Sequence, residues 1–199
     1  MLQRLADLPI KNFEAIKKYA DDPNAISFLG GQFNQENALL SRQAVEIIKI
    51  LPPDKVSSTE LYSVAVALQF SYQNDQAKEL YALTLQRSDT FNDTVAAQRG
   101  LANLYFLTGE PEKGRVKFQE ALEVFSKYSG YNSYTRKSTH IQTRLNWASA
   151  EAGMGFIELA EKQLILAKDI VTTIDSGPGR AQLGGQIDQA YKQIIGFQQ

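Results

Sequence analysis

Few side chains in this sequence have the types and spacing that catalysis or metal binding requires. The 199 residues include no cysteine and a single histidine, His140. Thiolate metal sites, a cysteine nucleophile and multi-histidine metal sites are therefore excluded. His140 lies among polar residues near the start of an expected helix, and we interpret it as an exposed surface residue. We expect no catalytic residue, no metal and no cofactor.

Three other polar residues have chemistry suited to recognition. Arg99 can hold a carboxylate with two charge-assisted hydrogen bonds, and the amides of Asn103 and Asn146 can bind an extended peptide backbone. Whether these groups cooperate depends on the elements that carry them.

The surrounding segments have the pattern of paired helices. Residues 100–122 place apolar or small residues at helical spacing on both sides of the sequence TGEPEKG. Gly109 can end the first helix in a left-handed conformation, and Pro111 suits the first turn of the second. We predict a helix, a sharp turn and an antiparallel helix.

The same hairpin pattern occurs three times. We compared the offsets 0, +1, +4, +8, +13, +17 and +20 from Leu101, and they match again from Trp147 and from Val64. The intervals are 147 − 101 = 46 and 101 − 64 = 37 residues. Glu151 is the one mismatch in the copy from Trp147, and Tyr72 and Thr84 are weak matches in the copy from Val64.

This arrangement of large, small and aromatic residues resembles the tetratricopeptide repeat over residues 58–172. The residues that carry the resemblance are Leu101, Ala102, Tyr105, Gly109, Phe118 and Ala121, with Trp147, Ala148, Gly155, Ala160, Leu164 and Ala167 in the second-best copy. The usual repeat is about 34 residues long, so this chain resembles a divergent member, with longer helices or an extra loop around residues 126–140. The resemblance implies an all-α, right-handed superhelix of helical hairpins.

The flanking segments are expected to complete a single domain over residues 1–199. Residues 1–56 predict accessory N-terminal helices, which we interpret as a degenerate first hairpin. Residues 175–180 predict a flexible break, and residues 181–197 a capping helix that covers the last open face.

The resemblance also implies a concave groove lined by the first helix of each hairpin. The residues expected to face a partner there are Tyr62, Gln69, Arg99, Asn103, Phe106 and Asn146. Some tetratricopeptide domains hold a peptide's C-terminal carboxylate with a basic residue and asparagines at matching places. Three interpretations stay open: such a clamp, a groove for some other protein segment, or a purely structural face.

A second candidate patch lies in residues 127–137. Its members are Tyr128, Tyr131, Tyr134, Arg136 and Lys137. Tyrosine and arginine favour protein interfaces, and interleaved aromatics and cations can also stack nucleotide bases. The alternative is that the tyrosines pack on the neighbouring helices while the charges face solvent.

Charge and hydropathy limit the remaining functions. Lys and Arg number 21 against 22 Asp and Glu, so no global field attracts nucleic acid or an anionic membrane. The first twenty residues carry charges throughout, and the longest uncharged run is too short to cross a bilayer. We expect a soluble, cytoplasmic, non-catalytic adaptor or assembly scaffold that binds a protein or peptide. The alternative is a homo-oligomerising scaffold or a regulatory domain of a larger complex.

Overall fold

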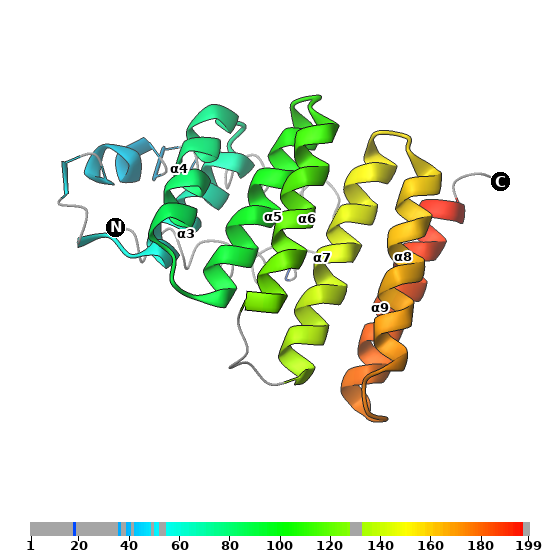
Figure 1. The fold of residues 1–199 in the computed structure, drawn as a ribbon. Helices are drawn as coiled ribbons and strands as arrows, with labels where there is room; N and C mark the ends of the chain where they lie inside the picture. The colour runs from blue at the N-terminus through cyan, green and yellow to red at the C-terminus, as the bar shows by residue number, and fades with distance from the viewer. Residues whose placement is uncertain are drawn as a thin grey trace. The chain divides into compact units, whose positions relative to one another are not determined.

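The computed structural model describes residues 55–127 and 133–196, together with residues 18, 36, 39–40, 42–48 and 50–51. Within these residues all regular secondary structure is helical (Figure 1). Seven of the helices have the bounds α3 Ser58–Phe70, α4 Asn74–Arg87, α5 Phe91–Leu107, α6 Pro111–Lys127, α7 Ser133–Gly153, α8 Ile157–Thr172 and α9 Pro178–Ile195. The all-α prediction is confirmed. Most of the predicted N-terminal helices, residues 1–56, lie outside the described residues.

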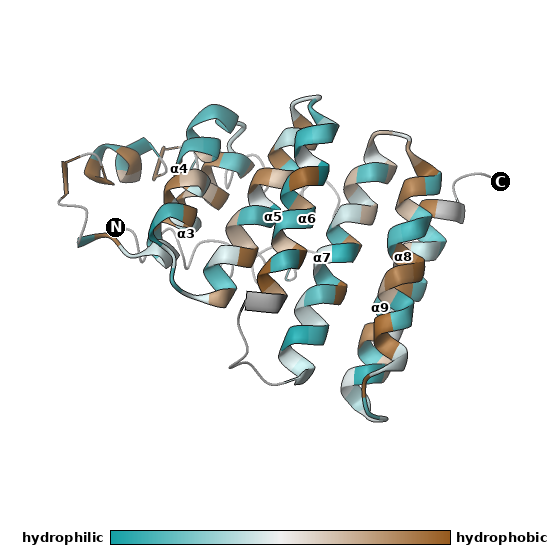
Figure 2. Cartoon of the chain, viewed as in Figure 1, coloured by the Kyte–Doolittle hydropathy of each residue, from teal (hydrophilic) through white to brown (hydrophobic). Residues whose placement is uncertain are grey.

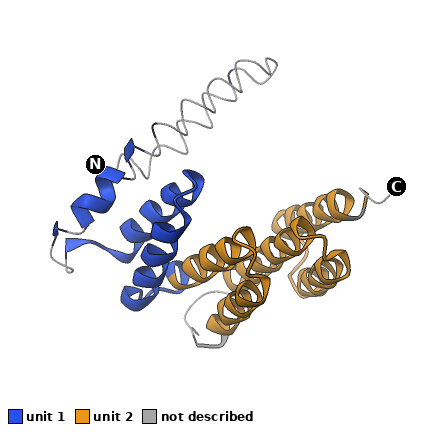
Figure 3. Ribbon diagram, turned by 90° about the horizontal axis from the view of Figure 1, so that it is seen from above, with its two compact units in different colours: residues 1–93 blue, residues 94–199 orange. Residues whose placement is uncertain are grey.

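The chain divides into two compact units, residues 1–93 and residues 94–199 (Figure 3). The first contains the pair α3 and α4, and the second contains α6 to α9 and nearly all of α5. The expectation of one continuous domain stays a prediction.

In the first unit, α3 begins at a capping box and packs on α4. The Ser57 side chain accepts a hydrogen bond from the Glu60 backbone N–H, and the Glu60 carboxylate accepts one from the Ser57 backbone N–H. Apolar residues of α3, including Leu61 and Leu68, are buried together with Ala77 of α4. Figure 2 shows hydrophobic and hydrophilic residues interleaved along the helices, as one-sided burial requires.

The three turns between paired helices share one backbone geometry. Tyr72, Gly109 and Gly155 have φ angles of 58°, 77° and 82°, and each lies eight residues after a start of the repeated pattern. The residue after each donates its N–H to a carbonyl five residues earlier, at distances of 2.9, 2.8 and 2.9 Å. This is the Schellman ending of a helix, in which a left-handed residue satisfies the last carbonyl groups. The predicted turn at Gly109 and Pro111 is therefore confirmed.

The second unit has two groups of buried apolar residues. Ala102, Phe106 and Phe118 form one group, against which Trp147 of α7 packs. The other joins α7, α8 and α9, and its α9 members are Leu183 and Ile187. Burial of these two residues agrees with a C-terminal helix that covers the preceding hairpin, although α9 begins at Pro178 rather than 181.

The extra length of the third copy lies partly in α7. This helix has 21 residues, compared with 17 in α5 and 13 in α3. It begins at Ser133, so the alternative of longer helices accounts for more than half of residues 126–140. The added turns at the N-terminal end of α7 carry the cations of the second candidate patch.

Candidate functional site

Two of the predicted groove residues meet between α5 and α7. With its amide oxygen turned toward Arg99, Asn146 accepts hydrogen bonds from Arg99 Nε at 3.1 Å and Nη2 at 2.8 Å. Both side chains are half-buried. Asn103 lies one turn after Arg99 on the same face of α5, and its amide makes no hydrogen bond within the described part of the chain. We call Arg99, Asn103 and Asn146 the polar triplet.

Three aromatic rings pack together beside the polar triplet. Phe118 of α6 stacks on Trp147 at a centroid distance of 5.5 Å with the ring planes 9° apart. Phe106 packs on Phe118 at 6.0 Å. Because Trp147 directly follows Asn146, this stack fixes α7 where Asn146 can reach Arg99.

Phe106 departs from its predicted place on the groove surface. Its side chain is 4% exposed and belongs to the buried group with Ala102 and Phe118. A Cβ atom on Gly114 would lie 2.4 Å from Phe106 Cδ2, so glycine at this position leaves the space that the ring fills. The same contact explains why glycine replaces the small alanine of the repeat pattern.

Sequence reasoning missed a buried ion pair between α6 and α7. The Glu151 side chain is 1% exposed, and its carboxylate accepts hydrogen bonds from Arg115 Nε at 2.8 Å and Arg115 Nη2 at 2.7 Å. Trp147 Nε1 donates to the same carboxylate at 2.8 Å. The hydrogen bond to Glu151 raises the pKa of Arg115 above its ordinary value. Glu151 was the mismatch in the repeated pattern, and this mismatch was the available signal.

Tyr62 and Gln69, the other predicted groove residues, belong to the first unit and surround Tyr81. The Tyr81 hydroxyl donates to Gln69 Oε1 at 2.8 Å, and the Tyr62 and Tyr81 rings lie 5.8 Å apart. Burial, reinforced by Tyr62, raises the pKa of Tyr81 well above its ordinary value. Both predicted residues are half-buried and therefore contribute to packing as well as to the surface.

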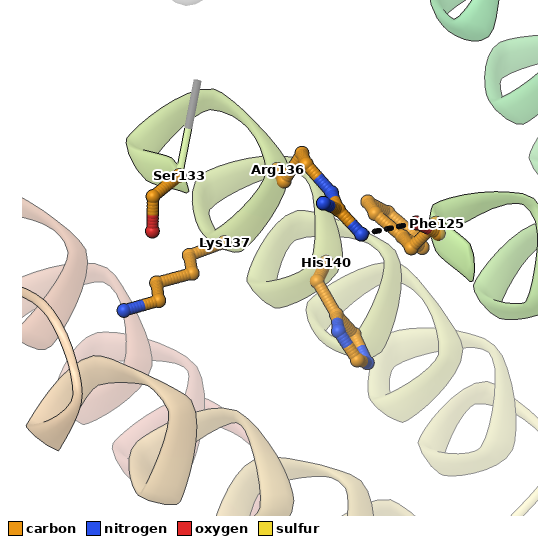
Figure 4. Close-up of a pocket in the computed structure, with 5 residues that line it drawn as sticks. All are labelled: Phe125, Ser133, Arg136, Lys137 and His140. Atoms are coloured by element: carbon orange, nitrogen blue, oxygen red, sulfur yellow. Dashed lines mark hydrogen bonds between the residues drawn. The ribbon is translucent and has the colours of Figure 1, made fainter. Parts of the chain in front are cut away.

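The second candidate patch lies beside a pocket at the N-terminal end of α7. This pocket of about 370 Å³ is lined by Phe125, Ser133, Arg136, Lys137 and His140 (Figure 4). The Arg136 guanidinium donates to the Phe125 carbonyl oxygen, while the Lys137 side chain points the other way. Lys137 Nζ donates to the Thr173 carbonyl oxygen at 2.6 Å.

The prediction that His140 is an exposed surface residue is wrong. Its ring is half-buried and stacks on Phe125 with the centroids 4.9 Å apart, and its Nε2 atom is buried without a hydrogen-bond partner. Burial, reinforced by nearby Arg144, lowers the pKa of His140 from 6.5 to about 4. The ring is therefore neutral at pH 7, and it acts as a packing residue because α7 extends over the end of α6.

Of the three tyrosines in the second candidate patch, the structure describes only Tyr134. Tyr128 and Tyr131 lie outside the described residues. The Tyr134 side chain is 46% exposed and covers Gly179 at the start of α9, where an added Cβ would lie 2.5 Å from the Tyr134 hydroxyl. The Tyr134 ring is thus partly engaged in packing.

Comparison with known proteins identifies a shared helical fold. No protein-family model and no curated protein sequence matches the chain. The fold is similar to the crystal structure of BtubC (BKLC) from P. vanneervenii, with a TM-score of 0.54 and 18% sequence identity. The similarity covers 96% of this chain and 84% of that chain. At this identity the likeness concerns the all-helical fold alone.

No group of three His, Asp or Glu side chains in the described ranges could hold a metal ion. No described helix has the length and apolar character needed to cross a bilayer.

Proposed function

We propose that this chain is a non-catalytic interaction module of the tetratricopeptide type that binds a protein segment across α5 and α7. The observation that carries the proposal is the Arg99–Asn146 contact, since it brings two of the predicted recognition residues together from first helices of successive hairpins. The recurring left-handed turn supports the repeat character of these hairpins.

The polar triplet suits a ligand whose carboxylate can replace the Asn146 amide oxygen as the acceptor for Arg99. The neutral amide oxygen of Asn146 receives two donors of the Arg99 guanidinium. A peptide carboxylate is a stronger acceptor than an amide for the same fork of donors. Displacement by a carboxylate would release the Asn146 amide to hydrogen-bond the peptide backbone, beside the Asn103 amide. This exchange favours a segment that ends in, or carries, a carboxylate.

The test compares the proteins retained by immobilised wild-type chain and by an Arg99→Ala/Asn103→Ala/Asn146→Ala variant. We expect a specific partner from the source-cell lysate to be lost from the triple variant and kept by Lys162→Ala, which changes an exposed cation on α8. Circular dichroism confirms that helicity is retained. A partner captured equally by all three proteins would exclude the polar triplet as its site.

The alternative function is self-association through the same helices. Light scattering over a concentration series separates the two, because an adaptor keeps the mass of one chain. A mass that rises with concentration in the wild type, and not in the triple variant, would assign the polar triplet to a homo-oligomeric scaffold.

A further inference from the structure

Two neighbouring pockets at the N-terminal ends of α7 and α9 form a cationic surface distinct from the polar triplet. The second pocket, of about 220 Å³, shares Ser133 and Lys137 with the first and adds Tyr134, Gly179 and Arg180 among its lining residues. We call the two pockets together the cationic cleft. Its three cations are Arg136, Lys137 and Arg180.

Each cation of the cationic cleft is anchored by a backbone carbonyl rather than by a carboxylate. Arg136 donates to Phe125 O, Lys137 to Thr173 O, and Arg180 Nη1 to Ile174 O at 3.2 Å. No carboxylate in the described ranges lies within 4 Å of these three groups. A neutral carbonyl fixes the side chain but leaves its positive charge uncompensated.

The remaining lining groups add hydrogen-bond donors and one opposing charge. Ser133 and Tyr134 contribute hydroxyl groups. Asp175 lines the second pocket and offsets part of its positive charge. His140 adds no charge at pH 7, because burial keeps its pKa near 4. The three cations therefore outnumber the one carboxylate.

We infer that the cationic cleft binds an extended, carboxylate-rich segment of a partner polypeptide, with acidic side chains placed in both pockets. Charge complementarity carries this inference, since separated cations in two adjoining pockets match successive acidic side chains along an extended chain. A nucleic acid suits the cleft less well. The Tyr134 ring already covers Gly179, and three cations with a nearby carboxylate offer little to a continuous row of phosphates.

The test measures fluorescence anisotropy of a short labelled peptide of alternating aspartate and glutamate, against a matched asparagine and glutamine peptide. We expect the acidic peptide to bind, more weakly as salt rises, and the neutral peptide not to bind. The Lys137→Gln/Arg180→Gln variant should weaken binding by about tenfold or more, because two charge-assisted contacts are lost. Asp175→Asn should tighten binding.

Matched variants keep the result interpretable. Lys162→Gln removes one exposed cation outside the cationic cleft and should leave the affinity within about twofold. Lys137→Arg/Arg180→Lys retains both charges and should restore most of the binding if the double glutamine variant loses it. Circular dichroism of each variant separates lost charge from lost folding.

Four results would overturn the inference. These are no anisotropy change with the acidic peptide, equal binding of the neutral peptide, an equal loss of affinity in Lys162→Gln, and tighter binding of a labelled single-stranded RNA at the same salt. All titrations use C-terminally amidated peptides and proteins that carry the Arg99→Ala/Asn103→Ala/Asn146→Ala changes, so the polar triplet cannot bind the peptide carboxylates itself. Failure of this inference therefore leaves the proposed function standing, and the reverse also holds.

Discussion

The two ends of α7 contact their neighbours in different ways. At the C-terminal end, Glu151 is buried and its carboxylate receives donors from Arg115 and Trp147. At the N-terminal end, Arg136 and Lys137 donate to backbone carbonyl oxygens beside two pockets, and His140 has a buried nitrogen without a hydrogen-bond partner. The buried carboxylate at one end is fully hydrogen-bonded within the fold, whereas the cations at the other end donate to neutral backbone carbonyl groups. This contrast separates residues that stabilise the hairpins from the residues for which we propose a ligand.

The largest expected effect comes from breaking the ion pair at the C-terminal end. Glu151→Ala leaves two donors of Arg115 and the Trp147 N–H without their acceptor, while Arg115 keeps its ion pair with Glu112, so we expect a loss of about 2–3 kcal/mol in the free energy of unfolding. Urea denaturation measures the change. The matched control is Glu120→Ala, which breaks an i,i+3 pair with Lys117 at 2.7 Å on the surface of α6 and should cost about 0–1 kcal/mol. Equal losses of stability in Glu151→Ala and Glu120→Ala would contradict a stabilising role for the buried ion pair.

The turn after α7 provides a backbone test at the same end. Gly155→Ala forces an alanine to φ near +82° and should destabilise the protein by about 1–2 kcal/mol. Gly153→Ala is the control, because Gly153 ends α7 without a left-handed φ. A Cβ at either position meets nothing within 4 Å, so the comparison isolates backbone conformation. Thermal unfolding should show a lower Tm for Gly155→Ala only.

At the N-terminal end, His140 should make stability depend on pH. The unfolded chain binds a proton to His140 near pH 6.5, but the folded chain does so only near pH 4. Because the unfolded state binds more protons between these values, stability should fall as the pH drops from 6.5 toward 4. His140→Phe retains an aromatic ring against Phe125 and removes the titration. Denaturation at pH 7 and pH 5 should show a smaller loss in His140→Phe than in the wild type, and equal losses would refute the assignment.

The smallest effect is expected from Arg136 at the same end. Arg136→Gln removes a cation that donates to the last turn of α6, an interaction worth about 0.3–1 kcal/mol. Urea denaturation should therefore show nearly wild-type stability. A loss as large as that of Glu151→Ala would mean that the N-terminal end of α7 is structural like the C-terminal end.

Local patterns predicted the helices better than they predicted side-chain environments. The apolar spacing and the turn at Gly109 gave the helical pairs correctly, because both depend on residues close in sequence. Tyr72 was a weak match to the repeated pattern, yet its backbone takes the same left-handed conformation as Gly109 and Gly155. Its side chain is 84% exposed, so no packing contact opposes this conformation. The hydrogen bonds of the Schellman turn therefore outweigh the preference of a single residue.

The candidate site was predictable only in part. The choice of Arg99 and Asn146 came from the resemblance to a repeat family, and the structure brings them into contact. The predictions that Phe106 and His140 lie on the surface were wrong. Phe106 is buried against α6, and His140 stacks on Phe125 because α7 is longer than the other first helices. Arg180 was not predicted as a site residue, because it lies beside Lys137 only when α9 packs on the preceding helices.

The sequence by itself determined that the chain forms helices in pairs, where the turns between them fall, and that cysteine and multi-histidine chemistry is absent. These properties depend on composition or on residues within one or two helical turns of each other. Only the tertiary structure decided that Arg115 meets Glu151, which is 36 residues away, and that Lys137 and Arg180 share a pocket. Such pairings depend on how helices pack, and packing is set by the combined shape of many buried side chains rather than by a fixed spacing.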